Sequence, residues 1–213
     1  MLISYKYKYI YIAVPKTGTV STESFLLEND PSLLQNRVIV NGKKKKVKAH
    51  ATALEIKQVM GEEFHKFHKI AIIRMPLSKM VSSYFFYKNG KPITSGNHNP
   101  YPAYLRVALA RILPFSLWSI IYPYKSNRGH LSDENNTPLV DYVGRLSNLE
   151  QDLKQIMLEI GMDFRQAKFP HKNTSKHKKE YSSYLKFGMQ IKIVQRKIKK
   201  DQDFVSKLLE KII

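Results

Sequence analysis

The sequence contains no cysteine and a single tryptophan among its 213 residues. The absence of cysteine excludes both a disulfide framework and a cysteine-ligated zinc site. No apolar run of signal-peptide length precedes the first predicted strand. The most apolar later segment, residues 104–122, is interrupted by Arg106, Arg111 and Pro114 and is therefore too broken to span a bilayer. We expect a cytoplasmic protein with no membrane span.

Acidic residues are also scarce. Only 17 aspartates and glutamates stand against 36 lysines and arginines, which gives a formal net charge of +19. This excess indicates either an anionic partner or simply a basic, solvated surface, because runs of like charge usually face water. Four lysines at positions 43–46 follow Asn41 and Gly42, a pair typical of a two-residue hairpin turn. We expect those lysines on an exposed strand or loop rather than in a catalytic site.

The most informative stretch is residues 9–21. An apolar strand at 9–14 runs into a turn of small residues, and a helical pattern follows at once; the turn reads Pro15-Lys16-Thr17-Gly18-Thr19-Val20-Ser21. Such a turn directs backbone N–H groups and a helix N-terminus at one point, which suits a phosphate, and Lys16 adds a positive charge. An ordinary strand-to-helix turn with a surface lysine is the alternative.

A second strand-to-helix junction lies at residues 68–87. The β-branched run at 69–74 ends in Arg74, and Pro76 suits the first turn of the helix that follows. Ser82 lies two turns into that helix. Since ligands of open α/β sheets bind beyond the carboxyl ends of the strands, both junctions are expected at one edge of the sheet. Arg74 and Ser82 can then converge on a second anion.

These two stretches resemble the nucleotide-binding elements of the sulfotransferases that use 3′-phosphoadenosine-5′-phosphosulfate, in particular the carbohydrate-type branch related to heparan sulfate 2-O-sulfotransferase. Residues 15–21 are similar to that family's P-K-T-G-[TS]-T-S loop, with Val20 in place of a threonine. Residues 74–82 are similar to its R-[DN]-P-x-x-[RK]-x-x-S element, with Met75 in place of the acid or amide. Weaker similarities are found at residues 48–56, 140–149 and 171–184.

The resemblance implies a fold, a reaction and a set of ligands. It implies an α/β domain of residues 1–213, with a P-loop-NTPase-like parallel sheet (strands near 9–14, 69–74 and 139–143) flanked by helices. The expected reaction transfers a sulfuryl group from 3′-phosphoadenosine-5′-phosphosulfate to a hydroxyl of a carbohydrate-like acceptor without a metal. The donor carries roughly −4 charges, so the net charge leaves room for an anionic acceptor. The 5′ side of the donor would be held by Lys16, Thr17, Gly18, Thr19, Val20 and Ser21, and its 3′-phosphate by Arg74 and Ser82.

Two residues are expected to carry the chemistry. Lys16 would meet the negative charge that develops on the leaving phosphate. His50 is the expected general base, because it lies just before a predicted helix start and histidine titrates near neutrality; the resemblance agrees. The alternatives are a structural His50 that caps this helix, and Glu55 as the base, although Glu55 also forms a predicted capping box with Thr52. His171, Asn173 and Ser175 are expected to close over the nucleotide.

The remaining segments are read by periodicity alone. Residues 88–138 are expected to form an acceptor-side insertion, with a helical part at 101–124 that Pro114 breaks and a mobile loop at 125–138. Trp118 is expected to pack in the core rather than stack on a sugar. A capping box at Ser147 and Glu150 starts a helix that stops at Gly161, and a last helix covers 189–213.

Two other classes of function remain open. A P-loop small-molecule kinase requires a Walker A lysine after the second glycine and an aspartate placed for Mg²⁺, and neither is present. A basic nucleic-acid-binding module is suggested by a pI near 9.9 and 13 tyrosines, but neither an RNP-like aromatic motif nor zinc-ligand spacing is found. We therefore expect a sulfotransferase without a nucleic-acid partner. The related animal Golgi enzymes carry an N-terminal anchor. Since no such segment precedes the first predicted strand here, we expect a bacterial protein.

Overall fold

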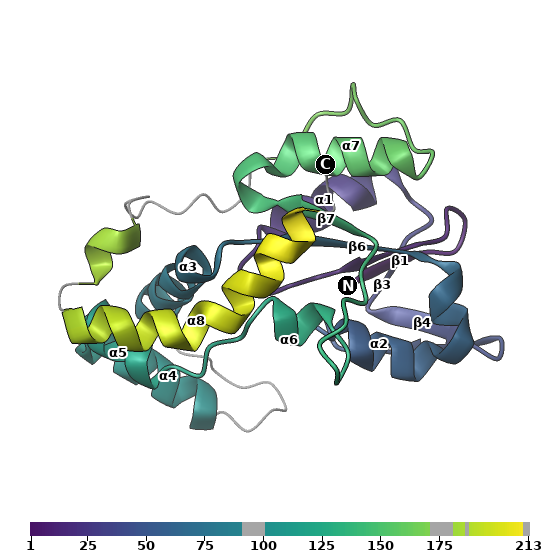
Figure 1. The fold of residues 1–213 in the computed structure, drawn as a ribbon. Helices are drawn as coiled ribbons and strands as arrows, with labels where there is room; N and C mark the ends of the chain where they lie inside the picture. The colour runs from purple at the N-terminus through teal and green to yellow at the C-terminus, as the bar shows by residue number, and fades with distance from the viewer. Residues whose placement is uncertain (91–100, 171–180, 186–187, 211–213) are drawn as a thin grey trace. The chain divides into compact units, whose positions relative to one another are not determined.

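The strand before the small-residue turn is β2 (Tyr9–Ile12), and all four of its residues are buried. β6 (His68–Ile73) pairs with β2 in parallel, and β7 (Tyr142–Arg145) pairs in parallel with β6 (Figure 1). The three predicted parallel strands are therefore present, although the third covers residues 142–145 rather than 139–143. Alternating residues of β2 and β6 face two separate cores, which is why these two strands are rich in consecutive apolar residues.

The computed structural model describes residues 1–90, 101–170, 181–185 and 188–210. Contacts divide the chain into two compact units. The first consists of Met1–Arg74, Lys125–Thr174 and Asp203–Ile213, and the second of Met75–Tyr124 and Ser175–Gln202. The sheet, the small-residue turn and Arg74 all belong to the first unit.

One edge of the sheet differs from the prediction. β1 (Leu2–Ser4) pairs with β2 in the antiparallel sense, and β3 (Leu34–Gln35) pairs antiparallel with β1, so the order is β3-β1-β2-β6-β7. The prediction of a purely parallel sheet was wrong here. Only residues 5–8 join β1 to β2, a link too short for a parallel crossover, and Lys8 takes a positive φ of 54° to make the turn.

Helices cover both faces of this mixed parallel and antiparallel sheet, so the fold is of the α/β class. α1 (Thr19–Asn29) and α7 (Leu149–Glu159) share one core with the side of the sheet that carries Tyr9 and Tyr11. α2 (Ala53–Met60), the 3₁₀ turn η1 (Gly61–Lys66) and α6 (Arg128–Leu131) share the other core with the side that carries Ile10 and Ile12. Figure 1 shows α1 and α7 on one side of the strands and α2 and α6 on the other.

Several local predictions within the first unit are confirmed. β4 (Arg37–Val40) and β5 (Lys43–Lys46) form the predicted hairpin, whose lysines are exposed. Its two turn residues, Asn41 and Gly42, have φ values of 51° and 72°. Thr52 and Glu55 form the predicted capping box of α2, and Gly61 ends that helix. Gly161, at φ 86°, ends α7, and the amide of Met162 bonds the carbonyl of Met157 at 2.8 Å, as in a Schellman motif.

Two local predictions in this unit are wrong. Ser147 does not cap α7: it lies in the 3₁₀ turn η2 (Leu146–Asn148), and Asn148 is the N-cap residue. Residues 125–138 are not an irregular loop, because they contain α6, whose Leu131 is fully buried. A turn stabilised by the Asp133 carboxylate, which accepts hydrogen bonds from the amides of Asn135 and Thr137, follows that helix.

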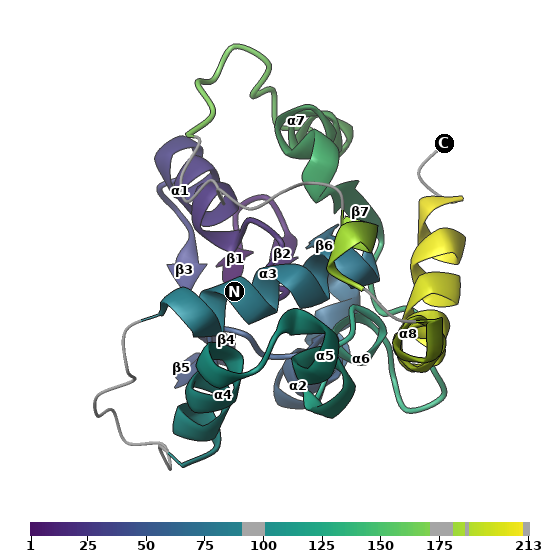
Figure 2. The same cartoon turned by 90° about the vertical axis from the view of Figure 1, so that its left-hand side faces the viewer.

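The second unit is helical. It contains α3 (Pro76–Asn89), α4 (Tyr101–Ile112), α5 (Phe115–Ile121), the 3₁₀ turn η3 (Tyr181–Tyr184) and the first part of α8 (Gly188–Leu209). Figure 2 shows α3, α4 and α5 from another side. Pro114 breaks the helical segment, as predicted. Trp118 packs in the core, also as predicted: it is 1% exposed and stacks on Tyr122 at 4.1 Å between ring centroids.

Candidate functional site: an anion site at the end of β2 and β6

The turn between β2 and α1 has an alternating backbone. Lys16 has a φ of 68° and Gly18 a φ of 79°, whereas Thr17 between them is not in the positive-φ region. This alternation turns successive N–H groups toward one side, the arrangement that forms anion-binding nests. A lysine with positive φ costs roughly 1–2 kcal/mol, so the surrounding structure must enforce this conformation.

Hydrogen bonds to one carbonyl hold the turn in place. The hydroxyls of Thr17 and Thr19 both donate to the Val14 carbonyl, at 2.8 and 3.0 Å. Thr17 is fully buried. Each hydroxyl has a single proton, so in this conformation both threonines can donate to an anion only through their backbone N–H groups. They were predicted as part of the anion site, and the structure gives their side chains a positioning role.

A close approach explains the glycine in the turn. A Cβ on Gly18 would lie 2.7 Å from Leu146 Cδ1 and 3.1 Å from Leu149 Cδ2, at the start of α7. Its positive φ is also a conformation that glycine adopts without strain. Gly18 is therefore required both by the backbone and by the packing of α7 on the turn.

α1 starts directly from this turn. Gly18 is its N-cap residue, and within the described residues no side chain caps the helix. The first-turn amides of Thr19 and Val20 therefore lie at the positive end of the helix dipole. Val20 is 50% exposed, while Ser21 is 5% exposed. Because its side chain is apolar, Val20 can offer a backbone amide but no hydroxyl to a ligand.

The structure brings Lys16 and Arg74 together, as predicted. Arg74 directly follows β6, the strand that pairs in parallel with β2, and its Nη1 donates to the Lys16 carbonyl at 3.4 Å. Burial, and secondarily the positive charge of Arg74, lower the pKa of Lys16 to about 8. Two cations so close repel each other, and an anion between them would relieve that repulsion.

Asn127 fixes the backbone at Arg74. Its fully buried side chain donates from Nδ2 to the Arg74 carbonyl at 3.0 Å, while its own carbonyl accepts from the amides of His130 and Leu131. Sequence reasoning missed this residue, because it placed Asn127 in a polar loop. The buried Leu131 at helical spacing from Asn127 was the available indication that this segment packs.

His50 lies at the same edge of the first unit. Its Nδ1 is 2.8 Å from the carbonyl oxygen of Ala13, the residue after β2, and its side chain is exposed. Since a carbonyl oxygen only accepts, this bond requires the proton on Nδ1 and leaves Nε2 as a proton acceptor. His50 does not cap α2, because Thr52 does.

Glu55, the alternative base, already has partners. Its Oε1 accepts from Lys48 Nζ at 2.8 Å and its Oε2 from the Thr52 amide at 2.8 Å. The hydrogen bond from Lys48 is the main cause that lowers the pKa of Glu55. A carboxylate bound in this way is a weak proton acceptor, so the geometry favours His50 over Glu55.

Other predicted residues lie outside this group. Ser82 belongs to the second unit, on α3, and is 5% exposed. His171, Asn173 and Ser175 lie outside the described residues. Within the described residues no three histidine, cysteine or acidic side chains gather where they could hold a metal ion. No helix of the described part has both the length and the apolar character that a bilayer crossing requires.

The comparisons with protein-family models, curated proteins and solved structures found no match to this chain. The site must therefore be interpreted from its own geometry and from the motifs of its sequence.

Proposed function

We propose that this protein is a sulfotransferase that transfers a sulfuryl group from 3′-phosphoadenosine-5′-phosphosulfate to a hydroxyl of a carbohydrate-like acceptor. The observation that carries the proposal is the proximity of Lys16 and Arg74, two cations that follow neighbouring parallel strands. The order of the motifs along the chain supports it, because residues 15–21 and 74–82 resemble the two nucleotide-binding elements of that family. In this proposal the fold is P-loop-like.

The proposed ligand has two anionic ends, and the site offers a group for each. The backbone N–H groups of the turn at 16–21 and the ammonium of Lys16 would hold the 5′-phosphosulfate. The guanidinium of Arg74 would hold the 3′-phosphate, and the motif resemblance alone assigns Ser82 to the same phosphate. Arginine suits this role, because its planar fork matches phosphate oxygens.

The chemistry requires placement and charge rather than a covalent intermediate. The acceptor oxygen forms a bond to sulfur while the bond from sulfur to the bridging phosphate oxygen breaks. Lys16 would stabilise the negative charge that develops on that oxygen, as cations do in phosphoryl transfer. The acceptor's hydroxyl proton would pass to Nε2 of His50, whose Nδ1 proton is held by the Ala13 carbonyl.

A calorimetric titration with adenosine 3′,5′-bisphosphate, the desulfated product, tests the proposal. Binding in the micromolar range without added metal, at least tenfold tighter than that of ATP with Mg²⁺, is the expected result. Lys16→Ala should abolish this binding, whereas Lys43→Ala, a matched exposed lysine on the hairpin, should leave it unchanged.

Two outcomes would contradict the proposal. A preference for ATP with Mg²⁺ would indicate a kinase. Binding of RNA or DNA that Lys16→Ala does not affect, in the absence of nucleotide binding, would indicate a nucleic-acid module.

A further inference from the structure

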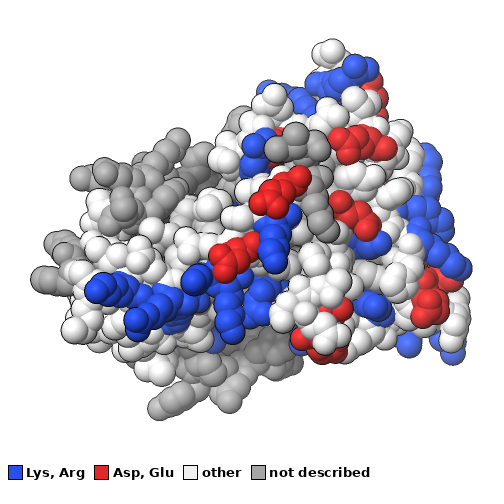
Figure 3. Space-filling model, in the orientation of Figure 1, with Lys and Arg blue, Asp and Glu red and all other residues white. Residues whose placement is uncertain are grey.

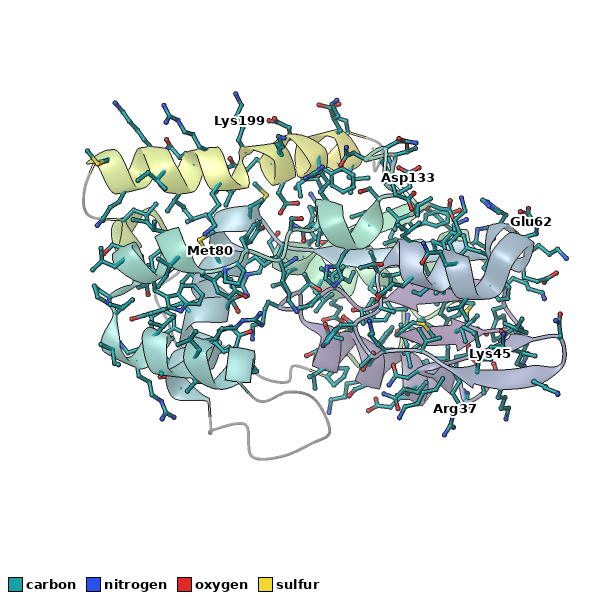
Figure 4. All side chains as sticks on the ribbon, turned by 90° about the horizontal axis from the view of Figure 1, so that it is seen from below. Arg37, Lys45, Glu62, Met80, Asp133 and Lys199 are labelled. Atoms are coloured by element: carbon teal, nitrogen blue, oxygen red, sulfur yellow. The ribbon has the colours of Figure 1, made fainter. Side chains whose placement is uncertain are left out.

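The outward side of α8 within the second unit carries four cations. Lys192, Arg196, Lys199 and Lys200 are all exposed and recur at intervals of three and four residues, which places them on one side of the helix. We call these four residues the α8 basic face. Figure 3 shows the row of blue side chains along this helix, and Figure 4 shows Lys199 pointing outward from it.

The α8 basic face forms no ion pair among the described residues. Between positions 188 and 202 the only acid is Asp201, which is 2% exposed and accepts a hydrogen bond from the Tyr124 hydroxyl at 2.5 Å. The exposed Asp203 of the same helix follows Lys199 by four residues and Lys200 by three, so the four cations of this side outnumber one exposed acid. None of the seven ion pairs of the described residues includes a residue of this face. Neighbouring like charges on a helix repel each other, so the face is complementary to a surface of negative charge.

Apolar side chains are exposed beside these cations. Met189 is 77% exposed and Ile193 is 37% exposed, and each lies three residues before a cation of this face, Lys192 and Arg196 respectively. Leu117 and Ile121, one turn apart on α5, are 44% and 53% exposed.

Lys197 connects the two helices. Its Nζ donates to the carbonyls of Ser119 and Ile120 at 3.0 and 2.7 Å. The C-terminal end of α5 therefore lies beside the middle of α8, within the same unit. The exposed apolar residues of α5 and the α8 basic face therefore belong to the same unit.

We infer that the second unit docks on a membrane that contains anionic lipids, with the α8 basic face on the headgroups and Met189, Ile193 and Ile121 at the acyl boundary. A helix with basic and aliphatic residues on its exposed side suits a lipid interface, because both kinds of side chain find a partner there. Nucleic acid would satisfy the cations only, since single strands are bound by aromatic stacking and exposed aliphatic residues contribute little. The mixture of side chains therefore favours lipid.

Vesicle co-sedimentation without any nucleotide tests this inference. The full chain should bind vesicles of phosphatidylcholine with 30% phosphatidylserine and should not bind pure phosphatidylcholine. Replacing the four cations of the α8 basic face by glutamine should weaken binding by about 100-fold or more, since each cation near an anionic surface contributes about one kcal/mol. Binding should also weaken strongly at high salt.

A second quadruple variant controls for net charge. Glutamine at the four hairpin positions Lys43, Lys44, Lys45 and Lys46 removes the same charge from another exposed surface, and it should weaken vesicle binding by less than fivefold. The double variant Met189→Ser and Ile193→Ser should weaken binding even at low salt. Circular dichroism verifies that each variant is folded.

Three results would overturn the inference. The first is equal binding of the wild-type chain to neutral and anionic vesicles, or binding to neither. The second is equal sensitivity to the two quadruple variants, which would assign binding to net charge alone. The third is binding to RNA or DNA, but not to vesicles, that depends on the α8 basic face. None of these results depends on sulfotransferase activity, so the two proposals can fail separately.

Discussion

His50 and the backbone at the end of β2 are joined by a hydrogen bond of 2.8 Å from the ring Nδ1 to the carbonyl oxygen of Ala13. The bond fixes the tautomer and leaves Nε2 as the only ring nitrogen that can take a proton. Lys16 lies three residues further along the same chain segment. The proposed base and the cation proposed to stabilise the leaving group are therefore held by one stretch of backbone, which is the reason to expect that they act on one substrate.

His50→Ala should separate chemistry from binding. We expect kcat for sulfuryl transfer to fall by about 10²–10⁴-fold, because a positioned general base contributes this much. The Kd for adenosine 3′,5′-bisphosphate should change by less than about threefold, since His50 contacts the turn and not the proposed phosphate sites. His65→Ala, at an exposed histidine of η1, is the matched control. Unchanged kcat in His50→Ala would exclude the assignment.

The affinity for adenosine 3′,5′-bisphosphate should depend on pH through Lys16. Burial and Arg74 lower the pKa of Lys16 to about 8, so the lysine is charged below that pH and neutral above it. Because the anion favours the charged form of Lys16, affinity should fall by up to about tenfold per pH unit above pH 8. Calorimetry from pH 6.5 to 9.5 measures this, and Lys16→Arg should remove the decrease. A wild-type profile without a change near pH 8 would contradict the assignment.

The same pKa predicts that Lys16 destabilises the free protein near neutrality. The folded pKa lies below the unfolded value of 10.5, so the unfolded chain binds more protons between those values and stability rises with pH there. Lys16→Met should therefore stabilise the protein at pH 7. The full shift corresponds to roughly 3 kcal/mol, which partial exposure reduces to about 1–2 kcal/mol. A chemical-denaturation series measures it, and a loss of stability in Lys16→Met would contradict the proposed burial of charge.

How far these features follow from the sequence differs between elements. The parallel core of β2 and β6, the Asn41-Gly42 hairpin and the capping box of α2 are confirmed, because each depends on a local pattern of apolar spacing, turn residues or cap residues. β1 was missed because three residues carry too little periodicity, and its pairing depends on a four-residue turn. Ser147 failed as a cap because η2 shifted the helix start by one residue.

The candidate site shows the same division. Lys16 and Arg74 were predicted to lie at one edge of the sheet, because the carboxyl ends of parallel strands share an edge. The inward hydroxyls of Thr17 and Thr19 and the role of Asn127 could not be predicted. They depend on which side a turn faces and on a contact between positions 74 and 127, which are distant in the sequence.

Gly18→Ala should damage the turn more than an ordinary positive-φ glycine would. The new Cβ meets Leu146 Cδ1 at 2.7 Å, whereas at Gly42, also at positive φ, a Cβ meets nothing within 4 Å. Gly42→Ala should therefore cost about 1 kcal/mol, and Gly18→Ala about 2–4 kcal/mol, because overpacking adds to the backbone strain. Thermal denaturation compares the two. Equal losses would mean that α7 yields to the added methyl group.

Asn127→Ala should disturb the backbone conformation at Arg74, although Asn127 itself is not proposed to contact a ligand. The substitution removes the buried hydrogen bond from Asn127 Nδ2 to the Arg74 carbonyl, which costs about 0.5–1.5 kcal/mol of folding free energy. Binding of adenosine 3′,5′-bisphosphate should weaken as well, while Asn135→Ala, at an exposed position of the same segment, should change neither property. Wild-type stability in Asn127→Ala would show that this bond does not hold Arg74.

The most direct test of the central claim, that Arg74 and Lys16 hold two ends of one nucleotide, is a comparison of two ligands. Calorimetry should measure adenosine 3′,5′-bisphosphate and adenosine 5′-monophosphate against the wild-type protein and Arg74→Ala, with Arg37→Ala as the matched exposed arginine. Removing a charge-assisted contact costs about 1.5–3 kcal/mol, so Arg74→Ala should weaken the bisphosphate by about 10–100-fold and the monophosphate by less than threefold. Equal losses for both ligands, or no binding of the bisphosphate by the wild-type protein, would contradict the account.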